Sequence, residues 1–452
     1  MGTRVILVRH GESSFNVERR VQGHLDQSLL TDRGIADAQR VGEALKGLAF
    51  DALYCSPLQR AQQTMQRIWD RLSNGMPSPS PETLDNLIEI GLPRWEGMLF
   101  SEVKQQFPVL YRQWHQAPHE LKMEVKQGSE VATVYPVQAV FRQAAQVWED
   151  LLPRHRHQTV LLVGHSGINR ALLCTALGLA PDRYQMLQQA NCNISVLNFP
   201  DGTLASAQLE ALNLTSHLDL PVPKPRPGYG ALRLLLVRHG ETDWNRQGRF
   251  QGQRDIPLNE NGKRQGRQAA AFLKGLPLDF AVSSPMQRPK LTAELILAHH
   301  PQISLALNDR LCEISHGTWE GRLEAEIEEA YPGELERWRT QPEQVQMPAG
   351  ENLQQVWDRT VAAWDEIVQE ALAQRDQQAM PTGMVVAHDA VNKVILCHTV
   401  GASAAKFWNF KQGNGAVSVI DFAADGRPTL QAMNITTHLD GGILDQTAAG
   451  AL

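Results

Sequence analysis

Arginine and histidine stand side by side twice in this chain, each time inside the hexapeptide Leu-Val-Arg-His-Gly-Glu. The first copy covers residues 7–12 and the second covers residues 236–241. A neutral imidazole is a nucleophile near pH 7, and an arginine guanidinium matches the oxygens of a phosphate group. The pair therefore indicates phosphate chemistry, and a hexapeptide with these side chains is not expected to recur by chance.

Further cationic and imidazole side chains follow each hexapeptide. Arg60 and Arg288 end the repeated segments SPLQR and SPMQR, and His165 and His388 each follow an apolar run. Two arginines and two histidines in one crevice would bind a doubly charged anion, and phosphate fits best. Because arginines can neutralise the charge of a phosphoryl group, we expect no metal ion and no cofactor at this site.

A leaving alkoxide needs a proton, so the site also requires an acid. Glu89 in LIEIGLPRWEG and Glu313 in LCEISHGTWEG are the repeated candidates. Glu96 and Glu320 near the ends of these segments are repeated as well. We expect those two to hold a turn, and the tryptophans before them to lie in the core.

The repeat extends over nearly the whole chain of 452 residues, which is longer than one core usually serves. His10 and His239 lie 229 positions apart, whereas NLTSHLD and NITTHLD near the ends of the copies lie 221 apart. Deletions in loops would produce such a drift, so a domain of about 220 residues has been duplicated. We predict a first domain at 1–219, a proline-rich linker at 220–230 and a second domain at 231–452. The duplication allows the two domains to pack as a pseudo-dimer.

Each copy is predicted to be an α/β domain. The apolar runs before Arg9, His165 and their repeats are unbroken, which is typical of buried parallel strands, and amphipathic helical segments lie between them. Both histidines of a copy would then follow the carboxyl ends of strands, where open α/β sheets bind ligands.

The segment before each second arginine is predicted to begin a helix. Ser56 would cap the helix and Pro57 would lie in its first turn, which places Arg60 over the helix N-terminus. In the second copy Pro289 follows Arg288. A proline inside a helix removes a hydrogen bond, so we expect this helix to start later or to kink.

The copies differ where the second histidine ends its strand. Asp389-Ala390 stands in the second copy where the first has Ser166-Gly167. An aspartate beside a phosphate pocket is unfavourable unless its carboxylate points away. We therefore expect weaker phosphate affinity in the second copy.

Composition excludes several classes of partner. The formal net charge of −6 argues against nucleic acid or an anionic membrane as a partner. No run approaches the roughly 18 apolar residues of a membrane span, and the N-terminus lacks a signal-peptide core. The five cysteines form no CxxC pair, which favours free thiols and a cytoplasmic location.

The segments LVRHGE, SPLQR, ExxxxxWEG and GHSG, in this order and in duplicate, resemble the histidine phosphatase superfamily. This resemblance implies a phosphoglycerate mutase-like fold, a mostly parallel sheet flanked by helices, and a phosphohistidine intermediate. In the first copy it assigns the nucleophile to His10, the proton donor to Glu89 and the phosphate pocket to Arg9, Asn16, Arg60 and His165. In the second copy the same roles fall on His239, Glu313, Arg238, Asn245, Arg288 and His388.

The residues after the acid indicate hydrolysis. Mutases of this superfamily follow the acid with an arginine and a tyrosine that grip the substrate, but here Glu89 and Glu313 are followed by Ile-Gly-Leu and Ile-Ser-His. The duplication resembles tandem members from cyanobacteria and plants. This resemblance implies a small substrate such as 2-carboxyarabinitol 1-phosphate, another sugar phosphate or an amino-acid phosphate. Phosphoserine hydrolysis, phosphoryl transfer of the mutase type and binding without catalysis remain alternatives.

The sequences after the two WEG segments are predicted to close over the sites and select the substrate. Residues 98–130 carry four basic and four acidic side chains, whereas residues 322–351 carry three arginines and eight glutamates. If these segments form lids, the second site should disfavour highly anionic substrates more than the first.

Overall fold

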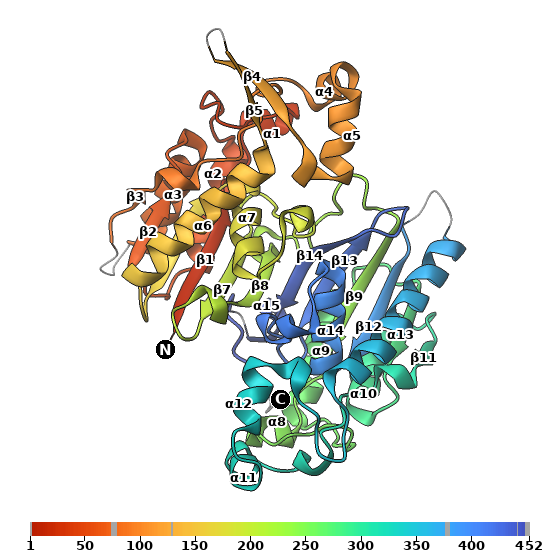
Figure 1. Ribbon diagram of the computed structural model, residues 1–452. Coiled ribbons are helices and arrows are strands. Elements are labelled where there is room, and N and C mark those ends of the chain that lie inside the picture. Colours follow the sequence, from red (N-terminus) through yellow and green to blue (C-terminus); the bar gives the residue numbers. More distant parts are fainter. Residues whose placement is uncertain (1, 74–78, 128–129, 376–379, 441, 448–452) are drawn as a thin grey trace. The chain divides into compact units, whose positions relative to one another are not determined.

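The computed structural model describes residues 2–73, 79–127, 130–375, 380–440 and 442–447. The chain divides into two compact units, residues 1–223 and 224–452, and each unit is described by itself (Figure 1). Within the described ranges, no helix is long and apolar enough to cross a membrane.

The first unit is built on six strands in the order β8-β7-β1-β6-β2-β3. Strands β1, β6, β2 and β3 are parallel, and β7 runs antiparallel to both β1 and β8. The sheet strands are β1 (Thr3–Arg9), β2 (Ala52–Cys55), β3 (Glu82–Thr83), β6 (Thr159–Gly164), β7 (Ile194–Phe199) and β8 (Gln208–Leu214). The predicted mostly parallel sheet is confirmed.

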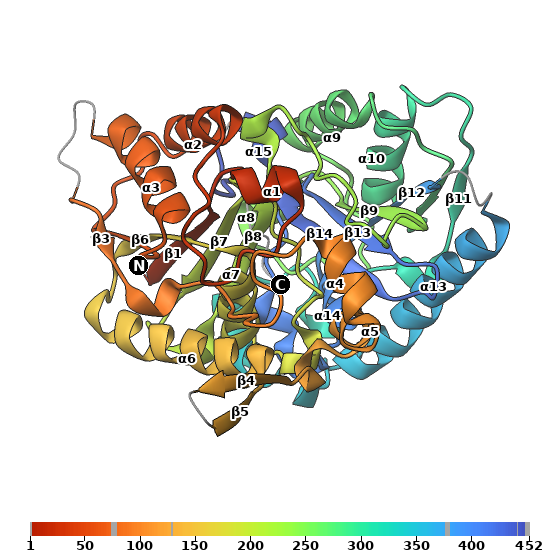
Figure 2. The same ribbon diagram turned by 90° about the horizontal axis from the view of Figure 1, so that it is seen from above.

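Helices cover both faces of this sheet (Figure 2). In that view α2 and α3 lie on one side of the strands, and α6 and α7 lie on the other. The α-helices are α1 (Ser14–Glu18), α2 (Asp32–Ala44), α3 (Gln59–Leu72), α4 (Phe100–Gln106), α5 (Pro108–Gln116), α6 (Pro136–Arg154) and α7 (Ser166–Ala176). A separate hairpin pairs β4 (Met123–Gln127) with β5 (Glu130–Val134).

The second unit repeats this plan, with strands in the order β14-β13-β9-β12-β10-β11. Its strands are β9 (Leu232–Arg238), β10 (Phe280–Ser283), β11 (Leu305–Leu307), β12 (Thr382–Ala387), β13 (Val417–Phe422) and β14 (Pro428–Ile435). Its α-helices are α8 (Asp243–Gln247), α9 (Glu260–Leu273), α10 (Gln287–Leu297), α11 (Glu324–Ala330), α12 (Glu334–Thr340), α13 (Leu353–Gln374), α14 (Asp389–Val400) and α15 (Thr437–Asp440). Helices α9 and α10 lie on one face, and α13 and α14 lie on the other (Figure 2).

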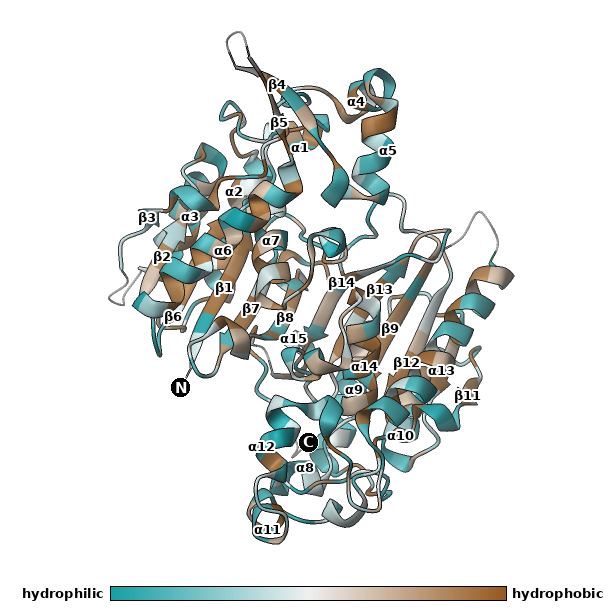
Figure 3. Cartoon of the chain, in the orientation of Figure 1, coloured by the Kyte–Doolittle hydropathy of each residue, from teal (hydrophilic) through white to brown (hydrophobic). Residues whose placement is uncertain are grey.

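The central strands are buried on both faces, as their unbroken apolar runs predict. The four residues from Val5 to Val8 in β1 and the four from Val160 to Val163 in β6 have no exposed surface. Figure 3 shows the corresponding central strands of both units largely in the hydrophobic colour, whereas α13 carries hydrophilic residues along much of its length. Each sheet therefore forms the middle of its unit's core.

The prediction for the helix that carries Arg60 is wrong in detail. Helix α3 begins at Gln59 with Leu58 as its N-cap residue, so Ser56 lies before the helix. The corresponding helix α10 begins at Gln287. Pro289 is the third residue of α10, where a backbone N–H would have no partner inside the helix. The proline therefore neither delays nor interrupts the helix.

The repeated NLTSHLD and NITTHLD segments begin at β-bulges. Asn213 and Asn434 have φ angles of 54° and 55°, a left-handed conformation that asparagine tolerates better than most residues. Their Oδ1 atoms accept backbone N–H groups of Ala190 at 2.8 Å and Gly413 at 2.7 Å. Each bulge thereby anchors the loop that precedes β7 or β13.

Candidate active sites

In the first unit the two candidate histidines are brought together by neighbouring strands. Arg9 ends β1 and pairs in register with Gly164 at the end of β6. His10 and His165 are the next residues, so their rings lie side by side with centroids 5.1 Å apart. In the second unit the centroids of the corresponding rings, His239 and His388, are 5.3 Å apart.

His10 is held as a neutral imidazole with one free nitrogen. Its Nδ1 lies 2.7 Å from the carbonyl oxygen of Gly11, so Nδ1 carries the proton and donates it. Burial, followed by the charges of Arg9 and Arg60, lowers the pKa of His10 well below 6.5. The Nε2 lone pair is therefore available for nucleophilic attack.

Arg60 and Arg9 are two of the positive charges at the first site. Arg60 is fully buried, and its terminal nitrogens donate to the carbonyls of Leu25 at 2.9 Å and Gly23 at 3.0 Å. Arg9 donates from Nη1 to the Gln189 carbonyl at 2.8 Å. Burial lowers the pKa of Arg9 to about 10, so the group stays charged at neutral pH. These bonds orient both guanidinium groups before a ligand binds.

Glu89 lies at the N-terminus of α7. Its Oε1 accepts the backbone N–H groups of Ile90 at 2.8 Å, Gly167 at 2.8 Å and Ile168 at 3.2 Å. Because these donors all reach Oε1, Oε2 is the oxygen left to exchange a proton with a substrate.

Asn16 is oriented by a second amide. Its Oδ1 accepts from the Ser13 backbone at 3.1 Å and from Asn191 Nδ2 at 3.2 Å. Asn191 Nδ2 also donates to the His10 carbonyl at 2.9 Å. The bonds to Oδ1 leave the Asn16 Nδ2 as the donor for a ligand beside His10.

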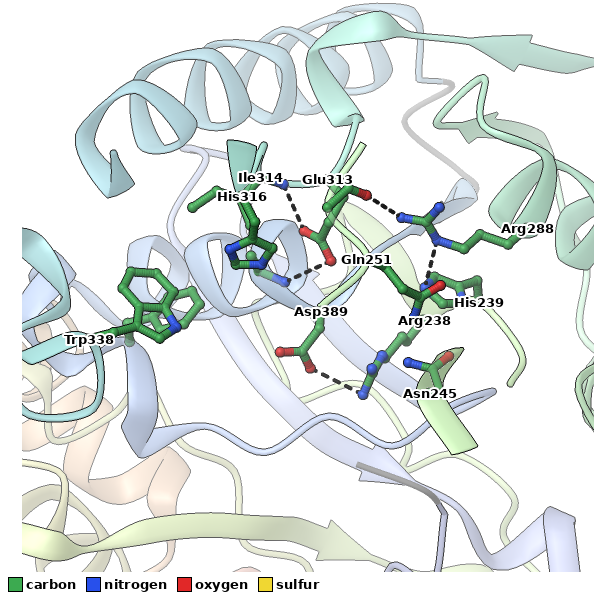
Figure 4. A pocket seen from close by; sticks show the side chains of 13 residues that line it. Arg238, His239, Asn245, Gln251, Arg288, Glu313, Ile314, His316, Trp338 and Asp389 are labelled. Carbon is green, nitrogen blue, oxygen red and sulfur yellow. Dashed lines mark hydrogen bonds and ion pairs between the residues drawn. The ribbon is translucent and has the colours of Figure 1, made fainter. Parts of the chain in front are cut away.

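In the second unit, five of the six predicted site residues line one pocket: Arg238, His239, Asn245, Arg288 and Glu313 (Figure 4). His388 lies behind them with Nε2 2.9 Å from Ser284 Oγ. Arg288 donates from Nε to His239 Nε2 at 3.2 Å, and burial lowers the pKa of Arg288 to about 10. The Arg288 guanidinium therefore lies against Nε2 of the His239 imidazole, the nitrogen that is not bonded to the Gly240 carbonyl.

Glu313 is more deeply buried than its counterpart Glu89. It is 8% exposed and accepts backbone N–H groups from Ile314 at 3.0 Å and Ala390 at 3.5 Å. Burial, followed by the charge of Asp389, raises the pKa of Glu313. Its carboxyl therefore holds a proton to higher pH than an ordinary glutamic acid does.

The Asp389 carboxylate does not point away from the second pocket. Its Oδ1 lies 3.2 Å from Arg238 Nη1 and its Oδ2 lies 2.7 Å from Lys393 Nζ (Figure 4 shows the first contact). An aspartate beside a phosphate site is harmless only when its carboxylate points away, and Asp389 does not meet this condition.

Residues outside the predicted set support both sites. Ser56 Oγ lies 2.7 Å from His165 Nε2, as Ser284 lies against His388. Asn414 donates to the His239 carbonyl at 3.2 Å, as Asn191 does to that of His10. Asn191 and Asn414 lie 223 positions apart, the same separation as His165 and His388. The signal in the sequence is therefore that the same residue type, asparagine, recurs at the separation of the two histidines.

Two further predictions about repeated side chains are confirmed. Glu96 accepts the backbone N–H groups of His24 at 3.1 Å and Leu92 at 3.0 Å, so it holds a turn. Trp95 and Trp319 are 2% and 0% exposed and belong to the cores.

The segments predicted as lids lie at the sites. In the second unit, Trp338 of α12 is buried and lines the pocket with Phe407. In the first unit, Trp114 of α5 packs on Tyr184 with ring centroids 6.0 Å apart. Tyr184 lies against Gly167 at the start of α7, beside Glu89. Both segments therefore border the candidate sites, and Glu130 at the end of the first belongs to β5.

No group of three or more His, Cys, Asp or Glu side chains is arranged to hold a metal ion in the described part of the chain. In the first site the positive charge comes from Arg9, Arg60 and Arg170, and the charges of the last two act on Arg9. The arrangement in each unit can bind a phosphate group, attack it with an imidazole and exchange a proton through a carboxyl group.

Comparison with known proteins agrees with this chemistry. A family model described as "Histidine phosphatase superfamily (branch 1)" matches residues 5–213 and 234–436. The 2-carboxy-D-arabinitol-1-phosphatase of Triticum aestivum is 29% identical over 446 residues, which cover 96% of this chain and 86% of that protein. Phosphoserine phosphatase 1 of Hydrogenobacter thermophilus is 36% identical over 208 residues, 46% of this chain and 94% of that protein. The solved structure of Bacillus stearothermophilus YhfR is 26% identical, covers 46% of this chain and 100% of that chain, and has a TM-score of 0.43.

Proposed function

Because this chain belongs to the histidine phosphatase superfamily, we propose that it hydrolyses phosphate monoesters of small metabolites through a phosphohistidine, without a metal ion. One observation carries the proposal. Each unit gathers two arginines, two histidines and a glutamate at the carboxyl ends of its strands, with the imidazole beside the guanidinium groups. Phosphoryl transfer needs this combination of charge neutralisation, nucleophile and acid.

In the first step Arg9, Arg60 and Asn16 hold the phosphate oxygens. His10 Nε2 forms a bond to phosphorus while the bond from phosphorus to the ester oxygen breaks. The leaving oxygen takes the proton of Glu89. The His10 Nδ1–H bond to a backbone carbonyl stabilises the positive charge that develops on the ring.

In the second step Glu89, now a carboxylate, takes a proton from water. The water oxygen attacks phosphorus and the nitrogen–phosphorus bond breaks, which returns His10 to its neutral form and releases inorganic phosphate. His165 assists both steps. Its Nε2 contacts Ser56, and its buried Nδ1 has no hydrogen-bond partner among the described residues, so Nδ1–H is placed to donate to a phosphate oxygen.

In the second unit the same roles belong to Arg238, His239, Asn245, Arg288, Glu313 and His388. Five of these groups line one pocket, and His388 packs against the nucleophile. We therefore assign two catalytic sites to the chain.

For the substrate, 2-carboxyarabinitol 1-phosphate is the first candidate, because the similarity to the wheat protein of that name extends over 96% of this chain. Phosphoserine is the second, because the similarity to a phosphoserine phosphatase covers the length of one domain.

A panel of phosphorylated metabolites tests the proposal. The panel includes both candidates and the phosphoglycerates, and it is assayed with EDTA at several pH values for release of inorganic phosphate. Release from at least one ester, abolished by the double change of His10→Ala and His239→Ala, is the expected result. Transfer to a second hydroxyl in place of water would indicate a mutase. Tight binding with no release from any ester would indicate a binding protein.

A further inference from the structure

The two sites share their catalytic groups but differ in the charges beside them. The first residue of the helix after the strand-end histidine is Ser166 in α7 and Asp389 in α14. One turn later stand Arg170 in α7 and Lys393 in α14. The second site therefore contains a carboxylate that the first lacks, whereas a cation stands one turn along the helix at each site.

Asp389 is built into the second pocket. Its side chain is 3% exposed and bridges Arg238 at 3.2 Å and Lys393 at 2.7 Å. The Lys393 ammonium lies 4.3 Å from the ring centre of Trp408. The indole carries no net charge, so Trp408 brings no second carboxylate to compete with Asp389 for the ammonium. Arg238 is the last residue of β9, and its guanidinium lines the pocket. An incoming phosphate must therefore share Arg238 with a carboxylate that is already bound to it.

In the first site the corresponding guanidinium has no carboxylate bound to it among the described contacts. Arg9 donates to the uncharged Gln189 carbonyl, and Arg170 donates to Leu187 O at 2.9 Å and Gln188 Oε1 at 2.8 Å. The first site thus combines Arg9 and the two cations that act on it, Arg60 and Arg170, with one carboxylate, Glu89. The second combines Arg238, Arg288 and Lys393 with both Asp389 and Glu313.

His316 adds a neutral polar group to the second pocket. It lines the pocket, is 4% exposed, and its Nδ1 has no hydrogen-bond partner in the described ranges. The first unit has the apolar Leu92 at the corresponding position. Burial lowers the pKa of His316 to about 3, so the ring is neutral at pH 7 and can bond a substrate hydroxyl or amine without attracting an anion.

We propose that Asp389 is a specificity-determining residue, which makes the second site select phosphate monoesters that carry an ammonium group or no second charge. The first site, where Arg170 acts beside Arg9 and Arg60 and only one carboxylate opposes them, selects monoesters that carry an additional carboxylate. This inference rests on the proposed phosphatase function. One chain would then hydrolyse two chemical classes of phosphate ester at its two sites.

Two substrates of similar size provide the test, phosphoethanolamine with an ammonium group and phosphoglycolate with a carboxylate. The second site is measured alone in His10→Ala and the first alone in His239→Ala. We expect the ratio of kcat/KM for phosphoethanolamine to that for phosphoglycolate to be on the order of tenfold higher at the second site, which corresponds to one charge acting in a partly screened pocket.

Reciprocal substitutions assign the difference to one position. Asp389→Asn keeps the side-chain volume and should move the ratio of the second site toward that of the first by on the order of tenfold. Ser166→Asp should move the ratio of the first site in the opposite direction. Asp389→Asn should also shift the basic limb of the second site's pH profile to lower pH, because the loss of this charge lowers the pKa of Glu313.

Binding of inorganic phosphate, measured by calorimetry in the same variants, does not depend on turnover. It should tighten on the order of tenfold in Asp389→Asn and weaken similarly in Ser166→Asp. If no ester is hydrolysed but these affinities change as expected, the proposed function fails, and of the inference only the effect of Asp389 on anion affinity stands. Unchanged ratios and affinities in both folded variants would overturn the inference. If Asp389→Asn does not fold, the result for Ser166→Asp decides.

Discussion

Replacing Glu89 by glutamine should remove one transferable proton from the first site while its hydrogen bonds stay in place. The Oε1 of Glu89 accepts three backbone N–H groups at 2.8, 2.8 and 3.2 Å, and a glutamine amide oxygen accepts the same donors. The fold around α7 should therefore be retained. Proton transfer contributes about 10²–10⁴-fold to kcat, or about 2.7–5.4 kcal/mol at about 1.36 kcal/mol per tenfold.

The assay compares two leaving groups in the His239→Ala background, where only the first site turns over. An alkyl phosphate needs a proton on its leaving oxygen, so Glu89→Gln should lower its kcat by about 10²–10⁴-fold. p-Nitrophenolate leaves without a proton, so the first step should remain fast. The second step still lacks its base, and a burst of one p-nitrophenolate per chain should precede slow turnover as phosphohistidine accumulates.

Glu96→Gln is the matched control. Glu96 also accepts two backbone N–H groups, at 3.1 and 3.0 Å. It holds a turn, and the proposed mechanism assigns it no proton transfer. Its substitution should affect both substrates equally. If Glu89→Gln slows both substrates to the same extent and shows no burst, or if Glu96→Gln shows the dependence on leaving group, Glu89 is not the acid.

Three further predictions concern both units. Rapid base quench during turnover should trap close to two phosphohistidines per chain, falling to about one in His10→Ala or His239→Ala; a single trapped site that always maps to the same histidine would leave the other unit a structural role. EDTA should leave hydrolysis unchanged and vanadate should inhibit it, because arginines hold the phosphate; full loss on chelation would contradict this. Burial lowers the pKa of both His217 and His438 to about 4, so each stabilises the folded state fully above pH 6.5 and loses up to about 3 kcal/mol as pH falls toward 4. Thermal unfolding from pH 7 to 4 should show this loss, and His217→Gln should reduce its slope.

The plan of each domain could be predicted because local signals agreed with one another. The unbroken apolar runs in β1 and β6 require burial on both faces, and this places Arg9 and His165 at one edge of a sheet. The predicted start of α3 is wrong, because the Ser56 hydroxyl contacts His165 and does not cap the helix. A serine followed by proline matches either use, and only the partner in space distinguishes them.

Site residues could be predicted where the repeat preserved a reactive side chain. Supporting residues such as Asn191 and Asn414 could not be predicted in the same way, because an asparagine in a loop usually serves a turn. Each donates to the backbone carbonyl of its nucleophilic histidine, which lies about 180 positions away in the chain. His24 is not repeated in the second copy, so the repeat gives no signal for it, although its Nε2 contacts the Glu89 carbonyl at 2.8 Å. Its second-unit counterpart, Gln253, makes the same contact with Glu313 at 3.0 Å, so the pair shares a position but no residue type.

The sequence by itself determined the duplication, the order of the strands' apolar runs and the side chains that carry the chemistry, because these depend on residue type and spacing. Only the tertiary structure decided where the side chains point. Asp389 could have turned toward solvent or toward the pocket, and its direction was set by Arg238 from β9 and Lys393 one turn along α14. A buried carboxylate is stable only where cations meet it, and residues 151 positions apart, such as Arg238 and Asp389, meet only once the sheet has formed.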